Sequence, residues 1–342
     1  SLVCPPDTDP VLDEPGLVEM LRFRSEKLHR CRVFPLGALT RGLRGEVLTE
    51  MVSLAQAGCI GFGQADVPLP TLQMLSRALQ YASTFGYTVW LRPQDRDLGT
   101  GVVASGPLAT RMGLTGVPVA AETIAIFSIL ELMRSSGARV HLCRISSAAG
   151  LELVRQAKAE GLPLTCDVSI HSLHLIDTDI GYFDSRSHLK PPLRQQRDRD
   201  AIGRALADGT VDALVSDHSP IDEDQKTLPF AESEAGASAV ELLLGMALKW
   251  AEAGGVALPR ALQVLTSAPA DILAAGQDGL RFGAGRLSVG GVADLCIYDP
   301  QAEWVINADN LRSQGKHTPF SGYALRSKVR CTIVDGTLAF ES

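Results

Sequence analysis

The sequence predicts an α/β fold: a parallel barrel of the (β/α)8 type followed by a small β module. Short apolar runs rich in β-branched residues alternate with longer helical patterns from the start of the chain to Val215. Such alternation is typical of parallel strands joined by right-handed helical crossovers. A doubly wound open sheet is the rival fold, but no Gly-x-Gly-x-x-Gly turn follows an early strand. The barrel is therefore favoured.

The first apolar run, Ser1–Cys4, has the pattern of a strand end, and the CPPDTDP stretch after it is typical of a turn-rich loop. Because so little precedes this strand, we expect sequence upstream of Ser1 that supplies the first of eight barrel strands. The other strands are expected at 32–35, 59–62, 87–91, 139–143, 164–168 and 211–215, with helices at 16–29, 45–57, 69–85, 120–134, 148–160 and 198–208.

Two further helices, 237–252 and 258–275, are expected after the last barrel strand. From Phe282 onward, Gly-rich turns separate short strands, which predicts a β module too small to fold alone. We therefore expect a barrel at 1–275 and a module at 276–342 that strands from the upstream sequence complete. The module strands are expected at Leu287, 293–298, 304–306 and 328–341.

The composition is that of an ordinary globular protein, with 45% hydrophobic and 21% charged residues among 342. A formal net charge of −7 argues against a nucleic-acid or acidic-membrane partner. No apolar run is long enough to span a bilayer, and no signal peptide opens the sequence. The seven cysteines form no Cys-x-x-Cys pair, so buried free thiols and a cytoplasmic location are expected.

Chemistry in a parallel barrel gathers where strands end, because the loops that leave them converge on one mouth. The strand Val211–Val215 delivers Asp217 and His218 to this position. Such an aspartate can bind a metal or take a proton from metal-bound water. The simpler interpretation is that Asp217 caps a turn in a polar loop.

Several landmarks, taken together and in order, resemble dihydroorotase, a metal-dependent amidohydrolase that closes and opens the dihydroorotate ring. The resemblance spans essentially the whole chain, including the C-terminal module. It implies a barrel whose mouth holds two zinc ions. The landmarks are CPPDTDP (4–10), PLGALTRGLRGEVLTEM (35–51), HLCRISS (141–147), CDVSIHSL (166–173), KPPLRQQRDRDAI (190–202) and SDHSPIDEDQK (216–226).

The departures from the family pattern fall on the metal and substrate positions. Arg144 replaces a ligating histidine of the HxxHxS motif, and a guanidinium cannot be deprotonated to bind zinc. Only Asp217 and His218 stand unchanged in the last motif, while the HxH motif of the first strand would lie upstream of Ser1. The positions interpreted as vestiges of the site are Asp7, Gln64, Ala65, Arg144, His171, Ser172, Lys190, Asp217, His218 and Ile221.

Arg144 has two interpretations, an anion-binding group at the mouth or an ion pair with Asp217, and the ion pair is favoured because a buried guanidinium needs a carboxylate. His171 and His174 could form a residual metal site with Asp217, but alternation after a strand would send the two side chains to opposite faces. Cys143 is interpreted as a buried strand residue rather than a nucleophile.

These losses predict a chain that is not an enzyme and that holds no cofactor or metal. The resemblance extends to inactive dihydroorotase-like chains of bacteria, and it implies a structural partner, the aspartate carbamoyltransferase catalytic chain, in a hetero-oligomer for pyrimidine synthesis. The alternative is a metal-dependent amidohydrolase with an altered or single-metal site, acting on dihydroorotate or another cyclic amide. A third possibility is a module that senses a pyrimidine intermediate, although Asp7 and Lys190 in place of neutral amides disfavour it.

Overall fold

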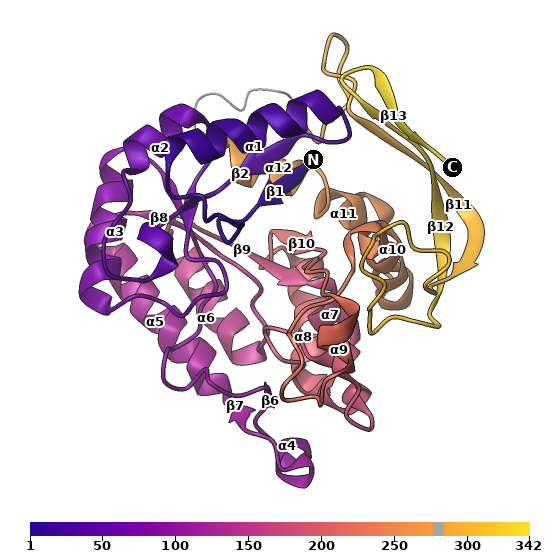
Figure 1. The fold of residues 1–342 in the computed structure, drawn as a ribbon, viewed down its shortest axis with the longest axis horizontal. Coiled ribbons are helices and arrows are strands. Elements are labelled where there is room, and N and C mark those ends of the chain that lie inside the picture. The colour runs from indigo at the N-terminus through magenta and orange to yellow at the C-terminus, as the bar shows by residue number, and fades with distance from the viewer. Residues whose placement is uncertain (276–283) are drawn as a thin grey trace.

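Seven parallel strands in chain order form the barrel wall in the computed structural model, which describes residues 1–275 and 284–342 (Figure 1). The Leu36 N–H donates to the Cys4 carbonyl oxygen, and the Gly37 N–H donates to the Gly61 carbonyl oxygen, so residues 33–35 and 37–38 act as one strand broken at Leu36. The expected parallel α/β barrel is confirmed. In order, the wall contains β1 (Leu2–Cys4), β2 (Val33–Pro35) with β3 (Gly37–Ala38), β4 (Phe62–Gly63), β5 (Thr88–Leu91), β8 (Arg139–Leu142), β9 (Leu164–Ser169) and β10 (Ala213–Val215).

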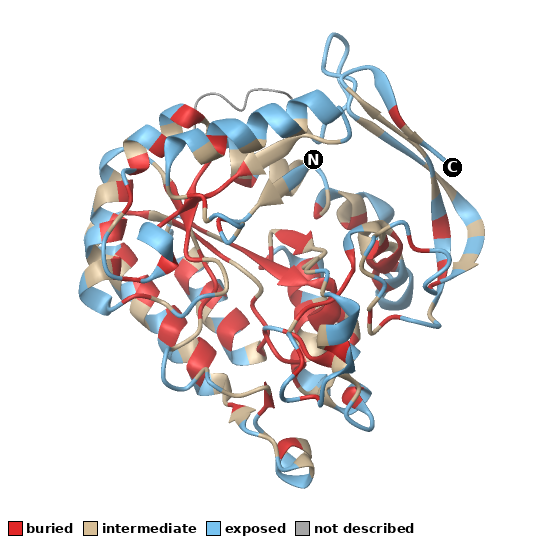
Figure 2. Ribbon diagram, in the orientation of Figure 1, coloured by how far each residue is buried: buried red, intermediate tan, exposed pale blue. Residues whose placement is uncertain are grey.

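Helices cover the outer face of the wall, and the buried residues concentrate between strands and helices (Figure 2). Side chains alternate along each strand. In β8, Val140 and Leu142 belong to the apolar core, whereas His141 contacts Thr165 of β9. The barrel helices are α1 (Pro15–Leu28), α2 (Met51–Ala57), α3 (Leu72–Thr84), α5 (Val119–Ser136), α6 (Ala148–Ala159) and α8 (Gln196–Asp208).

Three segments differ from the sequence-based expectation. The stretch after β9 continues as the short helix α7 (Ile170–His174), because the Ser169 side chain caps its start. The Gly-rich loop after β5 contains the paired strands β6 (Val103–Ala104) and β7 (Gly116–Val117) around α4 (Pro107–Met112). The C-terminal helical region is divided into α9 (Glu223–Thr227), α10 (Leu243–Gly254), α11 (Leu258–Gln263) and α12 (Ser267–Ala274).

The C-terminal module is an antiparallel sheet of β11 (Leu295–Val305), β12 (Ala324–Val334) and β13 (Thr337–Glu341), beside α10 in Figure 1. Leu325 of β12 is buried, and a methyl group placed on Gly245 of α10 would touch it. The predicted strand at Leu287 is wrong, since this side chain is 88% exposed and lies in no strand. Phe282 and the start of the predicted module lie outside the described residues, so the boundary after residue 275 stays a prediction.

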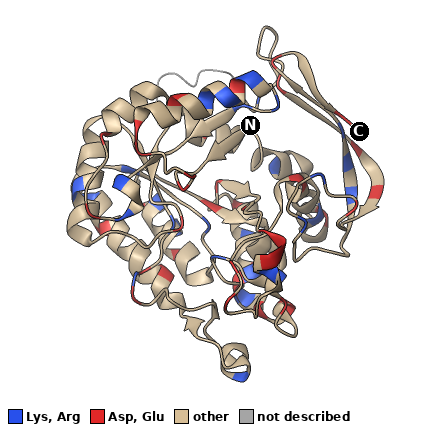
Figure 3. Ribbon diagram, in the orientation of Figure 1, with Lys and Arg blue, Asp and Glu red and all other residues tan. Residues whose placement is uncertain are grey.

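All seven cysteines are free, as expected, but they are not all buried. Cys59 and Cys166 are buried, whereas Cys296 on the β module is exposed. Basic and acidic residues intermix along the helices (Figure 3), in keeping with the argument against a nucleic-acid partner. No helix within residues 1–275 and 284–342 is long and apolar enough to cross a membrane.

A buried carboxylate fixes the loop between β8 and α6. Glu122 of α5 accepts hydrogen bonds from the backbone N–H and the hydroxyl of both Ser146 and Ser147, at 2.5 to 3.0 Å. The Ser147 hydroxyl in turn accepts the Gly150 N–H at 3.0 Å and caps α6. A carboxylate with four donors is well satisfied in the interior. Glu122 therefore holds the end of β8 in one position.

Gly150→Ala should destabilise the protein, although the same change inside a helix ordinarily stabilises it. A Cβ at this position would clash with the Glu122 carboxylate. We expect a loss of about 1–3 kcal/mol in the free energy of unfolding, measured by urea denaturation. Gly254→Ala is the control, because its Cβ would meet only Val256 at 3.5 Å. Equal stability of the two variants would contradict the conclusion that the Glu122 carboxylate is fixed against Gly150.

Candidate functional site

Three strand ends on the barrel wall hold non-glycine residues in the left-handed region. Ala65 follows β4 with φ of 50°, Arg144 follows β8 with φ of 56°, and Asp217 follows β10 with φ of 51°. Each such residue costs on the order of 1 kcal/mol, and conformations of this kind cluster at functional sites. The barrel mouth that these residues line is the candidate site.

The Arg144 guanidinium lies between two carboxylates at this mouth. Its Nη1 donates to Asp217 Oδ1 at 2.8 Å, to Asp66 Oδ2 at 3.2 Å and to the Lys190 carbonyl oxygen at 3.3 Å, and its Nη2 donates to Asp66. The predicted ion pair between Arg144 and Asp217 is confirmed. Asp66 was not predicted as a partner. Its place directly after Gln64 and Ala65 was the signal that could have identified it.

A second arginine extends the network. Arg92 follows β5, its side chain is only 5% exposed, and its Nε donates to Asp66 Oδ1 at 2.8 Å. Arg92, Asp66, Arg144 and Asp217 therefore form a chain of alternating charges, which we call the mouth network. Sequence reasoning missed Arg92, although the strand-end rule that selected Asp217 applies equally to it.

Both aspartates of the mouth network stay ionised at neutral pH. Burial by itself would raise the pKa of Asp217, but the Arg144 guanidinium and the neighbouring His171 together outweigh it and hold that pKa well below the ordinary value. The pKa of Asp66 is also lowered, because Arg144 and Arg92 together outweigh the effect of burial. Two positive and two negative side chains thus compensate one another.

His171 lies next to the network. Its Nδ1 is 3.0 Å from the Ser169 hydroxyl and 3.8 Å from Asp217 Oδ2, and its ring stacks on Phe320. The expectation that His171 and His174 alternate across a strand is wrong, since both lie on α7. His174 instead pairs through Nε2 with the Met246 carbonyl oxygen at 3.0 Å, and burial lowers its pKa to about 4.

The remaining sequence-predicted positions fall into two groups. Asp7 lies close enough to the mouth for the charge of Asp66 to add to the effect of burial, and both raise the pKa of Asp7. The Gln64 side chain bonds Thr40 and the Leu43 carbonyl oxygen, so it supports the loop after β3. The others stand apart from the network: His218 Nδ1 accepts the N–H groups of Ala239 and Val240, Ile221 packs by Gly236, and Ser172 is buried in α7.

A family assignment follows from sequence comparison. A dihydroorotase-like protein of Pseudomonas aeruginosa is 43% identical over 342 residues, covering the whole chain and 79% of that relative. The chain belongs to the dihydroorotase-like family. The dihydroorotase of Geobacter sp. strain M21 is 35% identical over 343 residues and is also covered to 79% of its length. The family model described as dihydro-orotase-like matches residues 2–149.

Solved structures support the same fold. The L-hydantoinase (dihydropyrimidinase) of Arthrobacter aurescens superposes with a TM-score of 0.86 at 22% identity, covering 99% of this chain and 76% of that one. A D-hydantoinase of a Thermus species gives a TM-score of 0.81 at 20% identity. At such identities the likeness establishes the fold alone.

The prediction that the chain is not an enzyme is wrong. It rested on lost zinc ligands at the mouth, whereas full-length relatives at 33–35% identity are named dihydroorotases. Possible metal ligands also remain elsewhere in the barrel. The loss of zinc ligands at the strand ends is therefore not sufficient evidence that a chain of this family has lost its activity.

The residues at the mouth do not fit the two zinc ions that the family implies. The Arg144 guanidinium already occupies the space between Asp66 and Asp217, and both carboxylates are engaged with it. A fixed positive charge there opposes a divalent cation.

Arg144→Ala should destabilise the fold by about 2–4 kcal/mol at pH 7, because it leaves the buried Asp217 carboxylate without its arginine partner and leaves Asp66 paired with Arg92 alone. The lowered pKa values of Asp66 and Asp217 stabilise the wild type above their unfolded values near 3.8, and this contribution is lost as the pH falls through the folded values. Without Arg144, burial raises the pKa of Asp217, so protonation of this carboxylate in acid removes part of the destabilisation of the variant.

The difference in unfolding free energy between wild type and Arg144→Ala should therefore shrink between pH 7 and pH 4. Urea denaturation at several pH values measures it. Arg111→Ala, an exposed arginine at the end of α4, serves as control. A pH-independent difference would show that the mouth network does not set the charge state of these carboxylates.

Proposed function

We propose that the protein is a cytoplasmic hydrolase of cyclic amides, acting on dihydroorotate or a related dihydropyrimidine ring. Family membership supports this class of substrate. The observation that carries the proposal is an ionised carboxylate, Asp217, held against the Arg144 guanidinium at the end of a barrel strand. Active sites of this fold are built at that position.

Ring opening adds water to the amide carbonyl carbon and then breaks the carbon–nitrogen bond. The carbonyl oxygen becomes negative during the addition, and a fixed guanidinium is suited to stabilise it. Arg144 Nε makes no hydrogen bond to the described residues, so this donor can face a substrate. Asp217 accepts the proton from the attacking water and returns it to the ring nitrogen as the carbon–nitrogen bond breaks.

A small cavity of about 10 Å³, room for one water molecule, lies beside Arg144, and Pro191, Pro192 and Arg194 form one of its walls. The lowered pKa makes Asp217 a weak base. We therefore expect slow turnover.

The test is ring opening of dihydroorotate, dihydrouracil and hydantoin by the purified protein, followed by chromatography of the products. Arg144→Ala should lower kcat by about 10²–10³, the usual effect of removing an oxyanion donor. Asp217→Asn should cause a comparable loss. Asp184→Asn, which breaks an ion pair with the partly exposed Arg186, should leave the rate unchanged. If the wild type opens none of these rings, the proposal is refuted.

We also propose that the protein assembles with the aspartate carbamoyltransferase catalytic chain, as the family resemblance suggests. One surface favours a protein partner: a groove of about 230 Å³ between α3 and α5. Leu72, Ile124 and Phe127, exposed to 59%, 47% and 59%, lie on these two helices, and Leu72 and Ile124 line the groove. Apolar side chains gathered on one face mark interaction sites more often than scattered ones do.

Phe127→Asp should abolish co-elution with the carbamoyltransferase on size exclusion at micromolar concentrations, since it places a charge in the apolar surface. Phe23→Asp, at an equally exposed aromatic residue on α1, is the matched control and should leave the complex intact. If the wild-type chains elute separately, this assembly does not form.

A further inference from the structure

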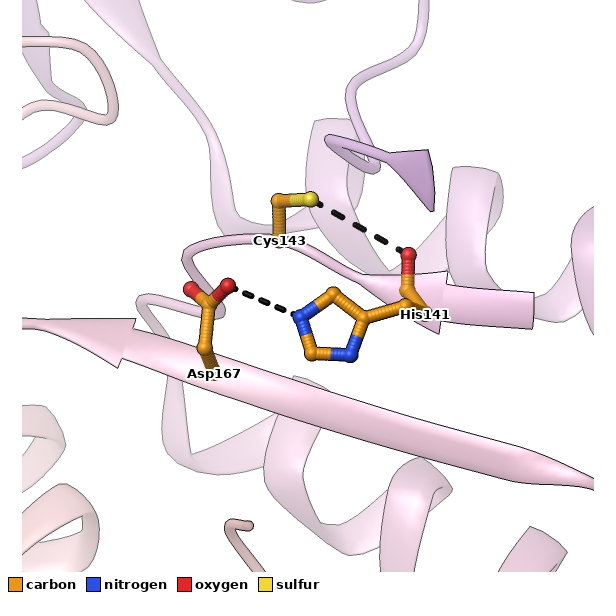
Figure 4. Close-up of side chains that lie close together, drawn as sticks. All are labelled: His141, Cys143 and Asp167. Atoms are coloured by element: carbon orange, nitrogen blue, oxygen red, sulfur yellow. Dashed lines mark hydrogen bonds and ion pairs between the residues drawn. The ribbon is translucent and has the colours of Figure 1, made fainter. Parts of the chain in front are cut away.

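A second group of reactive side chains lies inside the barrel wall, directly beside the mouth network. His141 and Cys143 are two residues apart at the end of β8, and Asp167 lies on the adjacent strand β9 (Figure 4). One ligand atom from each, an imidazole nitrogen, a thiol sulfur and a carboxylate oxygen, lies within 4.8 Å of the other two. We call these three residues the interior cluster.

The separations are close to those of a metal site. His141 Nε2 and Asp167 Oδ2 are 2.9 Å apart and share a hydrogen bond. Two such ligands on one tetrahedral zinc ion, each at about 2.0–2.1 Å from it, lie about 3.3 Å apart. The pair therefore needs to open by only a few tenths of an ångström. When a metal ion binds such a pair, it takes the place of the proton that the two ligands share in the metal-free protein.

Outer contacts hold two members of the cluster in orientation. His141 Nδ1 is 2.8 Å from the Thr165 hydroxyl, and the ring packs on Trp90 with 4.1 Å between centroids. Asp167 Oδ1 accepts the backbone N–H of Arg144 at 2.7 Å. These bonds leave His141 Nε2 and Asp167 Oδ2 directed toward each other, and ligating histidines and carboxylates are anchored in this way by neighbouring groups.

The ligand chemistry and the charge both favour zinc. Imidazole, thiolate and carboxylate form a mixed nitrogen, sulfur and oxygen set, which suits a borderline-soft cation and excludes magnesium or calcium. A divalent ion bound by one thiolate and one carboxylate is neutral as a unit, which reduces its repulsion by Arg144 and Arg92, whose charges reach Cys143. Cys143 is the partly exposed member of the cluster.

We propose that His141, Cys143 and Asp167 bind a single Zn²⁺ ion. The ion has three protein ligands and one further position for water or another small ligand. The cluster differs from the positions at which the family resemblance places its two zinc ions, where Arg144 now lies. The inference goes beyond the proposed hydrolase activity and does not depend on it, because metal binding is measured without turnover.

The test uses Co²⁺ as a spectroscopic substitute for zinc, titrated into the chelator-treated protein. We expect one equivalent to bind and to produce the near-ultraviolet charge-transfer band of a cobalt–thiolate bond. Cys143→Ala and Cys143→Ser should both lose the band and bind zinc at least tenfold more weakly. Two variants are used so that a defect in packing in one does not imitate loss of a ligand, and circular dichroism checks their folding.

Cys166→Ala is the matched control, since Cys166 is a buried thiol of the adjacent strand that lies near the Thr210 carbonyl oxygen, outside the cluster. It should retain both the band and the zinc affinity. Absence of the band in the wild type, or unchanged zinc affinity in both folded Cys143 variants, would overturn the inference. Ring opening by a wild-type protein that binds neither Co²⁺ nor Zn²⁺ would overturn the zinc site while leaving the proposed hydrolase intact.

Discussion

The structure of the barrel mouth depends on one buried guanidinium. Arg144 brings the ends of β4 and β10 together through Asp66 and Asp217, which otherwise carry like charges toward each other. Glu122 accepts the backbone N–H groups of Ser146 and Ser147, which follow Arg144 closely in the sequence. The backbone position of Arg144 is therefore fixed by its neighbours. A charge that cannot be removed within the physiological range thus keeps both carboxylates ionised.

Much of this arrangement could be predicted from sequence because it follows from periodicity and strand order. The alternation of short apolar runs with amphipathic segments located every barrel strand, and the placement of Arg144 and Asp217 at strand ends predicted their ion pair. The contacts that could not be predicted depend on how far a side chain extends and on which neighbouring group it meets in the folded protein. Nothing in residue spacing indicates that Arg92 extends to Asp66, or that Ser169 starts a helix and thereby turns His171 toward Asp217.

The error about catalysis has the same origin. Family ligands were judged one position at a time at the mouth, where the substitutions are plain. The alternation of β8 and β9 places His141, Cys143 and Asp167 on a common inner face, but this follows only once the register of the two strands is known, with His141 opposite Thr165. Register is a property of the folded sheet, and a sequence without its partner strand does not display it.

The left-handed backbone at Ala65, Arg144 and Asp217 has a consequence for how such a site can change over evolution. Each residue keeps this conformation although its side chain is small, cationic or anionic, so the surrounding strands and loops, not the side chain, determine it. The barrel therefore presents interchangeable positions whose chemical content can be replaced singly without rebuilding the scaffold. A metal ligand and a guanidinium can then succeed one another on the same strand end, and reaction chemistry can diverge faster than architecture.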